Sequence, residues 1–169
     1  MNERDFTTSP WIVTSHSVDQ TRLIAHDINQ LIFPTAVVLL SGDLGAGKTT
    51  IIQAMLADLG YAGPVKSPTF DLVHLYECDR VTVYHVDLYR IQSLVELEVL
   101  DLPHDGGGRN VLLAEWGDAL AGLYPDYFHL VCELCGPRCR RFSLTVHGDA
   151  YQSRWRQWRR EMAQKEINS

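Results

Sequence analysis

The chain has 169 residues, of which 46% are hydrophobic and 21% are charged, and its formal net charge is -6. These values are typical of one globular domain with a sizeable core. The acidic balance argues against a stand-alone binder of nucleic-acid backbone, which needs clustered Lys and Arg. No apolar run approaches the roughly 18 residues of a membrane span, and no signal peptide is evident, so we expect a cytoplasmic protein with no membrane contact.

The first predicted helix lies near the start of the chain. Residues 1–13 are polar and are expected to be loosely held, with a short strand at 11–14. Ser17 begins a capping-box pattern, and apolar residues follow it at helical spacing. Pro34 is expected to end this helix.

A glycine-rich turn separates the next strand from the next helix. The apolar run 36–41 predicts a strand that is buried on both faces of a parallel sheet. Residues 50–59 then predict a helix that ends at Gly60. Two strands are expected at 70–76 and 80–86, joined by a short acidic turn.

The second half of the chain alternates further strands with two helices. Residues 91–100 predict a helix, and 111–115 predict a second buried apolar strand. Residues 128–134 and 141–147 predict an antiparallel hairpin. A basic amphipathic helix is expected at 153–165.

Residues 42–49 match the phosphate-binding pattern G-x-x-x-x-G-K-[ST]. Its glycines let successive backbone N–H groups point into one concavity. Lys48 supplies a cation for the outer phosphates, and the Thr49 hydroxyl is suited to ligate magnesium. Because the motif follows a buried strand and precedes a helix, it predicts a nucleotide site and not a plain turn.

Together these elements predict an α/β fold of the P-loop NTPase class. We expect a mostly parallel central sheet with helices on both faces, plus an antiparallel hairpin. No internal repeat, low-complexity tract or long linker divides the chain, so residues 1–169 are expected to form a single P-loop ATPase domain.

Two buried strands end in acidic residues, and the carboxyl ends of parallel strands face the ligand crevice. Glu115 is the first candidate to hold magnesium, directly or through water; the alternative is a solvated strand end. Asp87 is a candidate to hold or position a water, or to cap the turn that follows it. His85 shares a strand face with Asp87 and is more simply a hydrogen-bonded structural residue than a base.

Four sequence blocks occur in one order: 42–50, 66–70, 85–90 and 114–116. In these blocks the chain resembles the TsaE family, formerly YjeE, of bacterial ATPases needed for threonylcarbamoyladenosine in tRNA. The resemblance covers about residues 14–147. It implies an ATP/ADP site with Mg²⁺, and adenine in preference to guanine.

The resemblance also implies roles for individual residues. Lys48, Asp87 and Glu115 would support catalysis, and Thr49 and Glu115 would bind magnesium. Ser67 and Thr69 would belong to a mobile segment that senses the γ-phosphate. Trp116, which alone could be a core aromatic, would sit beside the nucleotide. The implied nucleotide-binding residues are Asp43, Leu44, Gly45, Ala46, Gly47, Lys48, Thr49, Thr50, Ser67, Thr69 and Trp116.

The family's partners are TsaB-like and TsaD-like proteins, on which the ATPase is expected to act as a switch that is slow without them. Any tRNA contact is expected only within that assembly. A P-loop small-molecule kinase is the alternative, although no clear Arg-bearing lid precedes Glu115. A nucleotide-gated binding module with little hydrolysis is a third reading.

Three features remain open from the sequence. The residues near Ser17, together with Arg140 or Arg141, are candidates to contact adenine. The loop 105–108 matches the D-x-x-G of GTP switches, but no Asn-Lys-x-Asp guanine reader occurs, so we expect a plain loop. The basic helix at the C-terminal end either docks on the domain or meets an acidic partner surface or tRNA.

Cysteine usage argues against a disulfide scaffold, because four cysteines are too few at this length. Three of them, Cys132, Cys135 and Cys139, have the spacing C-x-x-C-x-x-x-C. Structural or free thiols are favoured over a zinc site, since the spacing falls across a predicted strand and turn.

Overall fold

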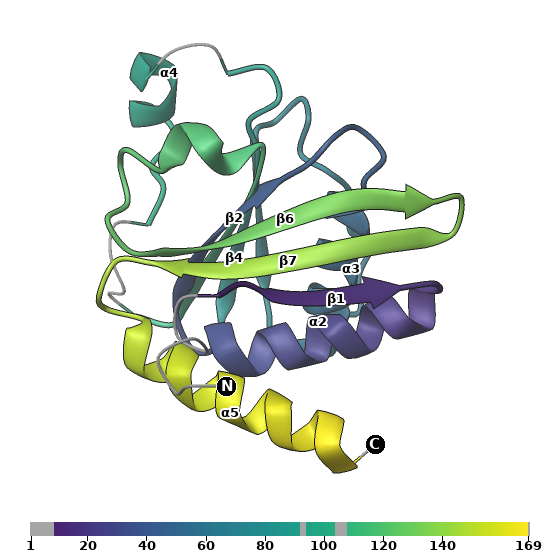
Figure 1. Ribbon diagram of the computed structural model, residues 1–169. Coiled ribbons are helices and arrows are strands. Elements are labelled where there is room, and N and C mark those ends of the chain that lie inside the picture. Colours follow the sequence, from purple (N-terminus) through teal and green to yellow (C-terminus); the bar gives the residue numbers. More distant parts are fainter. Residues whose placement is uncertain (1–8, 92–93, 104–107, 169) are drawn as a thin grey trace.

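The computed structural model describes residues 9–91, 94–103 and 108–168 (Figure 1). Its strands form one seven-stranded sheet in the order β1-β7-β6-β2-β5-β4-β3. The strands are β1 (Trp11–Ser15), β2 (Ala36–Ser41), β3 (Val73–Glu77), β4 (Thr82–Asp87), β5 (Asn110–Glu115), β6 (Tyr127–Gly136) and β7 (Cys139–His147).

The sheet is mixed, so the prediction of a mostly parallel sheet is wrong. β2 pairs in parallel with β5 and β6, and β4 pairs in parallel with β5. β1–β7, β3–β4 and β6–β7 are antiparallel. The reason lies in the connections: β3–β4 and β6–β7 are joined by short turns, and a short turn permits only antiparallel neighbours. The predicted antiparallel hairpin is confirmed as β6–β7.

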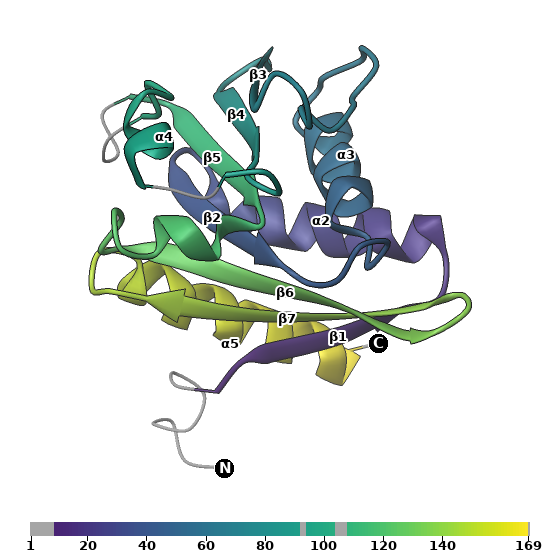
Figure 2. The same cartoon turned by 90° about the horizontal axis from the view of Figure 1, so that it is seen from above.

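Helices cover both faces of the sheet, as predicted, but unequally (Figures 1 and 2). One face carries α2 (Val18–Ile32), α3 (Lys48–Asp58) and α5 (Gln152–Asn168), which pack on the larger core cluster. Among the described residues, the other face carries only the five-residue helix α4 (Leu94–Glu98) and the four-residue 3₁₀ helix η1 (Gly117–Leu120), over a smaller cluster.

The parallel centre of the sheet brings the ends of three strands together. Leu40 of β2 lies opposite Glu115 of β5, and Asp87 of β4 lies opposite the same glutamate. β2 and β5 are buried along nearly their whole length, as expected for strands covered on both faces. The two acidic strand ends are therefore neighbours beside the turn that follows β2.

Several boundaries differ from the sequence prediction. Trp11–Ser15 forms a paired strand, which confirms the short strand predicted at 11–14 and extends it by one residue; residues 1–8 lie outside the described part of the chain. The strand predicted at 70–76 begins only at Val73, because the chain turns at Leu72, which has a φ of 64°. The helix predicted at 91–100 is limited to Leu94–Glu98 within the described residues.

The remaining helices follow the sequence more closely. The Ser17 hydroxyl accepts from the amide of Gln20, and the Gln20 side chain accepts from the amide of His16, which confirms the capping-box start of α2. α3 begins two residues earlier than expected, at Lys48, because it starts inside the P-loop. The predicted loop 105–108 lies outside the described residues except for Gly108.

The C-terminal helix α5 docks on the domain. Trp155, Trp158 and Met162 are buried in the larger core cluster. The Arg154 guanidinium donates to the carbonyls of Phe33 and Thr35, just past the end of α2. Burial of two tryptophans stabilises this helix against the sheet, since large aromatic side chains contribute much apolar area.

Within the described ranges, no helix combines the length and apolarity needed to cross a membrane.

Candidate nucleotide-binding site

The P-loop lies between β2 and α3, where the strand ends and the helix begins. Gly42 has a φ of 135°, and a Cβ on it would lie 2.1 Å from the carbonyl oxygen of Cys132 on β6. Only glycine can occupy this position, since any side chain would strike the neighbouring strand. Lys48 is buried, and its ammonium group donates to the carbonyls of Gly42 at 2.6 Å and Asp43 at 3.0 Å. The lysine charge is thus held inside the curled loop.

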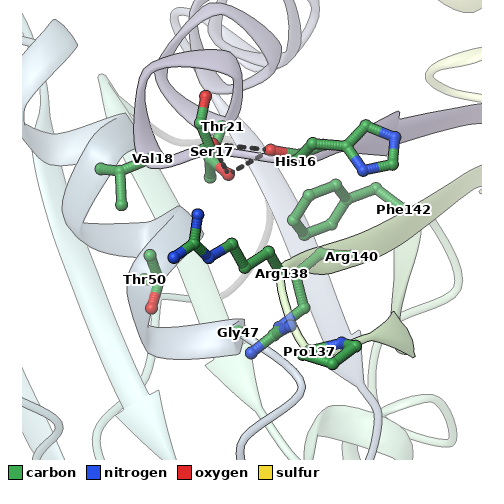
Figure 3. A pocket seen from close by; sticks show the side chains of 11 residues that line it. His16, Ser17, Val18, Thr21, Gly47, Thr50, Pro137, Arg138, Arg140 and Phe142 are labelled. Carbon is green, nitrogen blue, oxygen red and sulfur yellow. Dashed lines mark hydrogen bonds between the residues drawn. The ribbon is translucent and has the colours of Figure 1, made fainter.

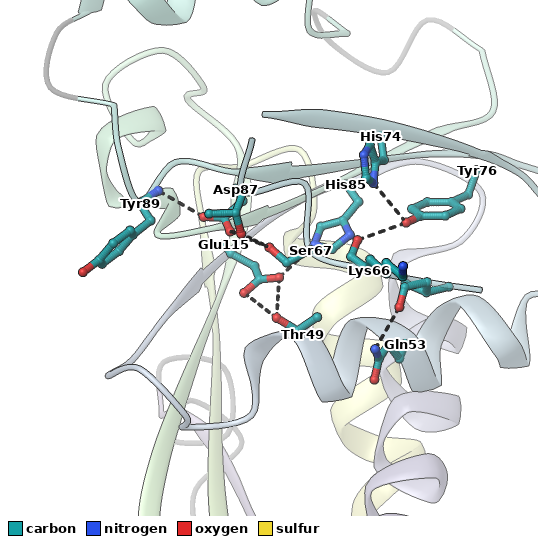
Figure 4. Close-up of polar contacts among 12 residues, drawn as sticks. Thr49, Gln53, Lys66, Ser67, His74, Tyr76, His85, Asp87, Tyr89 and Glu115 are labelled. Atoms are coloured by element: carbon teal, nitrogen blue, oxygen red, sulfur yellow. Dashed lines mark hydrogen bonds and ion pairs between the residues drawn. The ribbon is translucent and has the colours of Figure 1, made fainter. Parts of the chain in front are cut away.

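Glu115 lies directly against the start of α3. The Thr49 hydroxyl is 2.9 Å from each carboxylate oxygen of Glu115 (Figure 4). Glu115 is only 3% exposed, so the alternative of a solvated strand end is wrong. A buried carboxylate and a hydroxyl beside a P-loop form the oxygen donor set that magnesium prefers.

His85 supports the glutamate from the next strand. Its Nε2 lies 2.8 Å from Glu115 Oε1, and its side chain is fully buried. Since the carboxylate only accepts, Nε2 carries the proton of this bond. Nδ1 has no hydrogen-bond partner among the described residues. This geometry agrees with the reading of His85 as a hydrogen-bonded structural residue.

Asp87 joins two parts of the site. Its Oδ1 accepts from the amide of Tyr89, as the alternative reading of Asp87, a cap on the following turn, expects. Its Oδ2 accepts from the hydroxyl of Ser67 at 2.5 Å (Figure 4). It also accepts from the hydroxyl of Thr69 at 3.1 Å. The segment before β3 is therefore fastened to the end of β4 through one carboxylate.

Trp116 follows Glu115 and adopts a left-handed backbone conformation, with a φ of 57°. Its ring centroid lies 4.0 Å from the ammonium nitrogen of Lys48 and 5.1 Å from the ring centroid of Tyr89. The ring also packs against the smaller core cluster. Trp116 is thus a half-buried aromatic that faces the P-loop lysine, a cation–π geometry.

Most of the residues described above line one cavity of about 320 Å³, whereas Gly42 and His85 lie outside its lining. Of the nucleotide-binding residues expected from the sequence, Asp43 and Ala46 do not line it: Ala46 is buried, and Asp43 offers its backbone carbonyl to Lys48. Tyr89 lines the cavity and was not predicted. The lining residues are Leu44, Gly45, Gly47, Lys48, Thr49, Thr50, Ser67, Thr69, Asp87, Tyr89, Glu115 and Trp116.

A second cavity of about 430 Å³ adjoins the first, because Gly47 and Thr50 line both. Ser17 and Arg140, two of the candidates for adenine contact, line it, whereas Arg141 does not. Figure 3 shows side chains of the β6–β7 hairpin facing Val18 and Thr50 across this cavity. Ser15, His16 and Val18, which neighbour Ser17 in the chain, line it as well. The lining residues that the sequence did not reveal are Thr21, Pro137, Arg138 and Phe142.

The cysteines do not form a metal site. Cys135 and Cys139 are joined by a disulfide, while Cys78 and Cys132 are free. Among the described residues, no three His, Cys, Asp or Glu side chains are placed to share a metal ion. The expectation of thiols is therefore wrong for Cys135 and Cys139. Burial raises the pKa of the Cys132 thiol to about 12.

Comparisons with known proteins all point to one family. Residues 15–142 match the family model described as threonylcarbamoyl adenosine biosynthesis protein TsaE. A TsaE protein of Haemophilus influenzae is 41% identical over 90 residues, which is 53% of this chain and 57% of that protein. One from Rickettsia conorii is 36% identical over 65% of this chain and 63% of its own length. The match thus spans less than two thirds of these two relatives.

A longer match is found in Bacillus subtilis. Its TsaE protein is 33% identical over 79% of this chain and 84% of its own length. Among solved structures, the crystal structure of Bacillus subtilis YdiB superimposes with a TM-score of 0.69 and 25% identity, and covers 91% of this chain and 97% of that chain. On the strength of the family match and these relatives, the chain belongs to the TsaE family.

Proposed function

We propose that this chain is an ATP-binding and ATP-hydrolysing switch required for threonylcarbamoyladenosine modification of tRNA. It would act on a complex of TsaB-like and TsaD-like partners. Membership of the TsaE family supports a role in threonylcarbamoyladenosine biosynthesis. The observation that supports ATP hydrolysis is the contact of the Thr49 hydroxyl with both oxygens of the buried Glu115, at the base of the P-loop.

The two adjoining cavities suit the two halves of a nucleoside triphosphate. The phosphates would occupy the cavity of about 320 Å³, with the backbone amides of the P-loop and Lys48 around them. The base and sugar would occupy the cavity of about 430 Å³, beside Arg138 and Arg140. Gly47 and Thr50 line both cavities, so a single ligand can span them.

The residues present fit a magnesium ion at the phosphate end. Thr49 and Glu115 would hold it, with phosphate oxygens and water completing the shell, because magnesium takes few protein ligands at such sites. Bound there, magnesium would offset the negative charge of the β- and γ-phosphates. His85 keeps the Glu115 carboxylate turned toward Thr49 through the bond at 2.8 Å.

Hydrolysis requires water to attack the γ-phosphorus in line with the bond to the leaving β-phosphate oxygen. Lys48 would stabilise the charge that develops on the transferred group. Asp87 would orient this water, but the hydroxyls of Ser67 and Thr69 occupy its Oδ2. An engaged carboxylate positions water poorly, which supports slow turnover until a partner rearranges the 67–69 segment.

The deciding experiment follows the labelled terminal phosphate of ATP. The protein is incubated with ATP and magnesium, alone and with TsaB-like and TsaD-like proteins, and Lys48→Ala serves as the blank. We expect release as inorganic phosphate, at a higher rate with the partners. Transfer of the label to a small metabolite in an extract, without a partner effect, would instead establish a kinase. Tight binding with no release under either condition would establish a nucleotide-gated binding module.

A further inference from the structure

The tip of the β6–β7 hairpin carries the disulfide between Cys135 and Cys139. Cys135 is exposed and Cys139 is partly exposed, so a small thiol reagent can reach the bond. Cys132, by contrast, is fully buried on the same hairpin. Exposed disulfides are the labile and regulatory ones, and those in reducing compartments are typically transient or redox-sensing.

The same tip forms one wall of the second cavity. Pro137 and Arg138 lie inside the ring closed by the disulfide, and both line the cavity (Figure 3). Arg140, the residue after Cys139, also lines it, and its guanidinium donates to the carbonyl of Cys139 at 3.0 Å. The Cδ of Arg140 lies 3.7 Å from the position that a Cβ on Gly47 would take. Arg140, the residue next to the ring, therefore links the disulfide-bonded tip to the P-loop side of the cavity.

We propose that the Cys135–Cys139 pair is a redox modification site that sets the affinity for the nucleoside part of the ligand. In the disulfide form, the short ring restricts the tip and keeps Arg138 and Arg140 at the cavity. In the dithiol form, the tip gains conformational freedom that it must lose when a nucleotide binds. The inference rests on the proposed function, because it assigns the second cavity to the base and sugar.

The chemistry needs only a thiol partner. A cellular or added dithiol reduces the bond: the S–S bond breaks, Cys135 and Cys139 each gain one electron and one proton, and the two sulfurs of the dithiol form a disulfide. The reverse exchange with a disulfide oxidant re-forms the bond. Cys132 stays out of this exchange, because the nucleophile is the thiolate and burial raises the pKa of this thiol to about 12.

The test compares two redox forms of the full chain. One sample is oxidised and the other is reduced with dithiothreitol, and free thiols are counted in each. Calorimetry then gives the Kd for ATP and, separately, for inorganic tripolyphosphate, which has no base or sugar. We expect reduction to weaken ATP binding about fivefold and to leave tripolyphosphate binding unchanged, because only preorganisation of the second cavity is lost.

Two variants act as controls. Cys135→Ser with Cys139→Ser should bind ATP like the reduced protein and should not respond to dithiothreitol. Cys78→Ser should keep the full response, because Cys78 lies outside both cavities. A thermal melt of each variant separates a local effect on binding from loss of folding.

Three results overturn the inference. They are equal ATP affinity in both redox forms, four titratable thiols in the oxidised sample, and an equal loss of tripolyphosphate binding on reduction. If wild-type protein binds ATP and Lys48→Ala does not, but reduction has no effect, only this inference fails. If wild-type protein binds no ATP in either form, the proposed function fails together with it.

Discussion

The two cavities that meet at Gly47 are built in different ways. The cavity proposed for the phosphates, here called the phosphate end, is formed by the ends of β4 and β5 and the start of α3, and Lys48, Asp87 and Glu115 there are each at most 5% exposed. Each of these three charged groups has a fixed partner inside the protein. The cavity proposed for the base and sugar, here called the nucleoside end, is formed by the start of α2 and by a hairpin tip where Pro137 and Arg138 are exposed.

This difference indicates which part of the site tolerates substitution. Removing a partner at the phosphate end leaves a buried charge unpaired, which costs far more than the loss of an exposed contact. A charge at the hairpin tip is screened by water and contributes little. We therefore expect mutational effects to fall steeply from the phosphate end to the hairpin end.

The largest effect is expected for Lys48→Ala. This change removes the ammonium group at the centre of the P-loop, and ATP affinity should fall about 100-fold or more, which calorimetry would detect as loss of binding. Lys66→Ala is the matched control, because Lys66 is exposed and lines neither cavity. Tight ATP binding by Lys48→Ala would remove this lysine from its proposed role.

Glu115→Ala should separate binding from turnover. ATP binding should remain within about tenfold of wild type, while magnesium-dependent phosphate release should drop about 100-fold, because a metal ligand and its charge are lost. Glu133→Ala, at an exposed position on β6, is the control. Normal hydrolysis in Glu115→Ala would exclude this carboxylate from the mechanism.

Substitution of His85 should have a smaller effect on turnover, because this residue acts through Glu115. His85→Ala removes the bond to the carboxylate and should lower turnover about tenfold, with little change in ATP affinity. His85→Gln can place an amide N–H near the position of Nε2 and should restore most of the turnover. If alanine and glutamine variants lose turnover equally, with the same loss in melting temperature, the histidine contributes only packing.

The smallest effect is expected at the hairpin. Arg138→Ala should weaken ATP binding about threefold and leave tripolyphosphate binding unchanged, because Arg138 lines only the second cavity. Arg141→Ala is the control, since this neighbouring arginine lines neither cavity. An effect at Arg138 as large as that of Lys48→Ala would contradict the contrast between the two ends.

The sequence by itself determined the phosphate end. The glycine pattern, Lys48 and Thr49 are consecutive in the chain, so their relation is local and can be read directly. Glu115 and Asp87 could also be predicted, because apolar runs mark buried parallel strands and the carboxyl ends of such strands meet at one edge. The bond from Thr49 to Glu115 and the adjacent placement of Asp87 agree with that logic.

Only the tertiary structure decided the nucleoside end. The second cavity forms where the start of α2 meets a hairpin from the other end of the chain, and no local pattern encodes that meeting. The number of parallel neighbours and the approach of Arg138 to the cavity likewise depend on how distant segments pair and in which register. Local patterns specify which groups a segment offers, whereas long-range packing specifies which groups face one another.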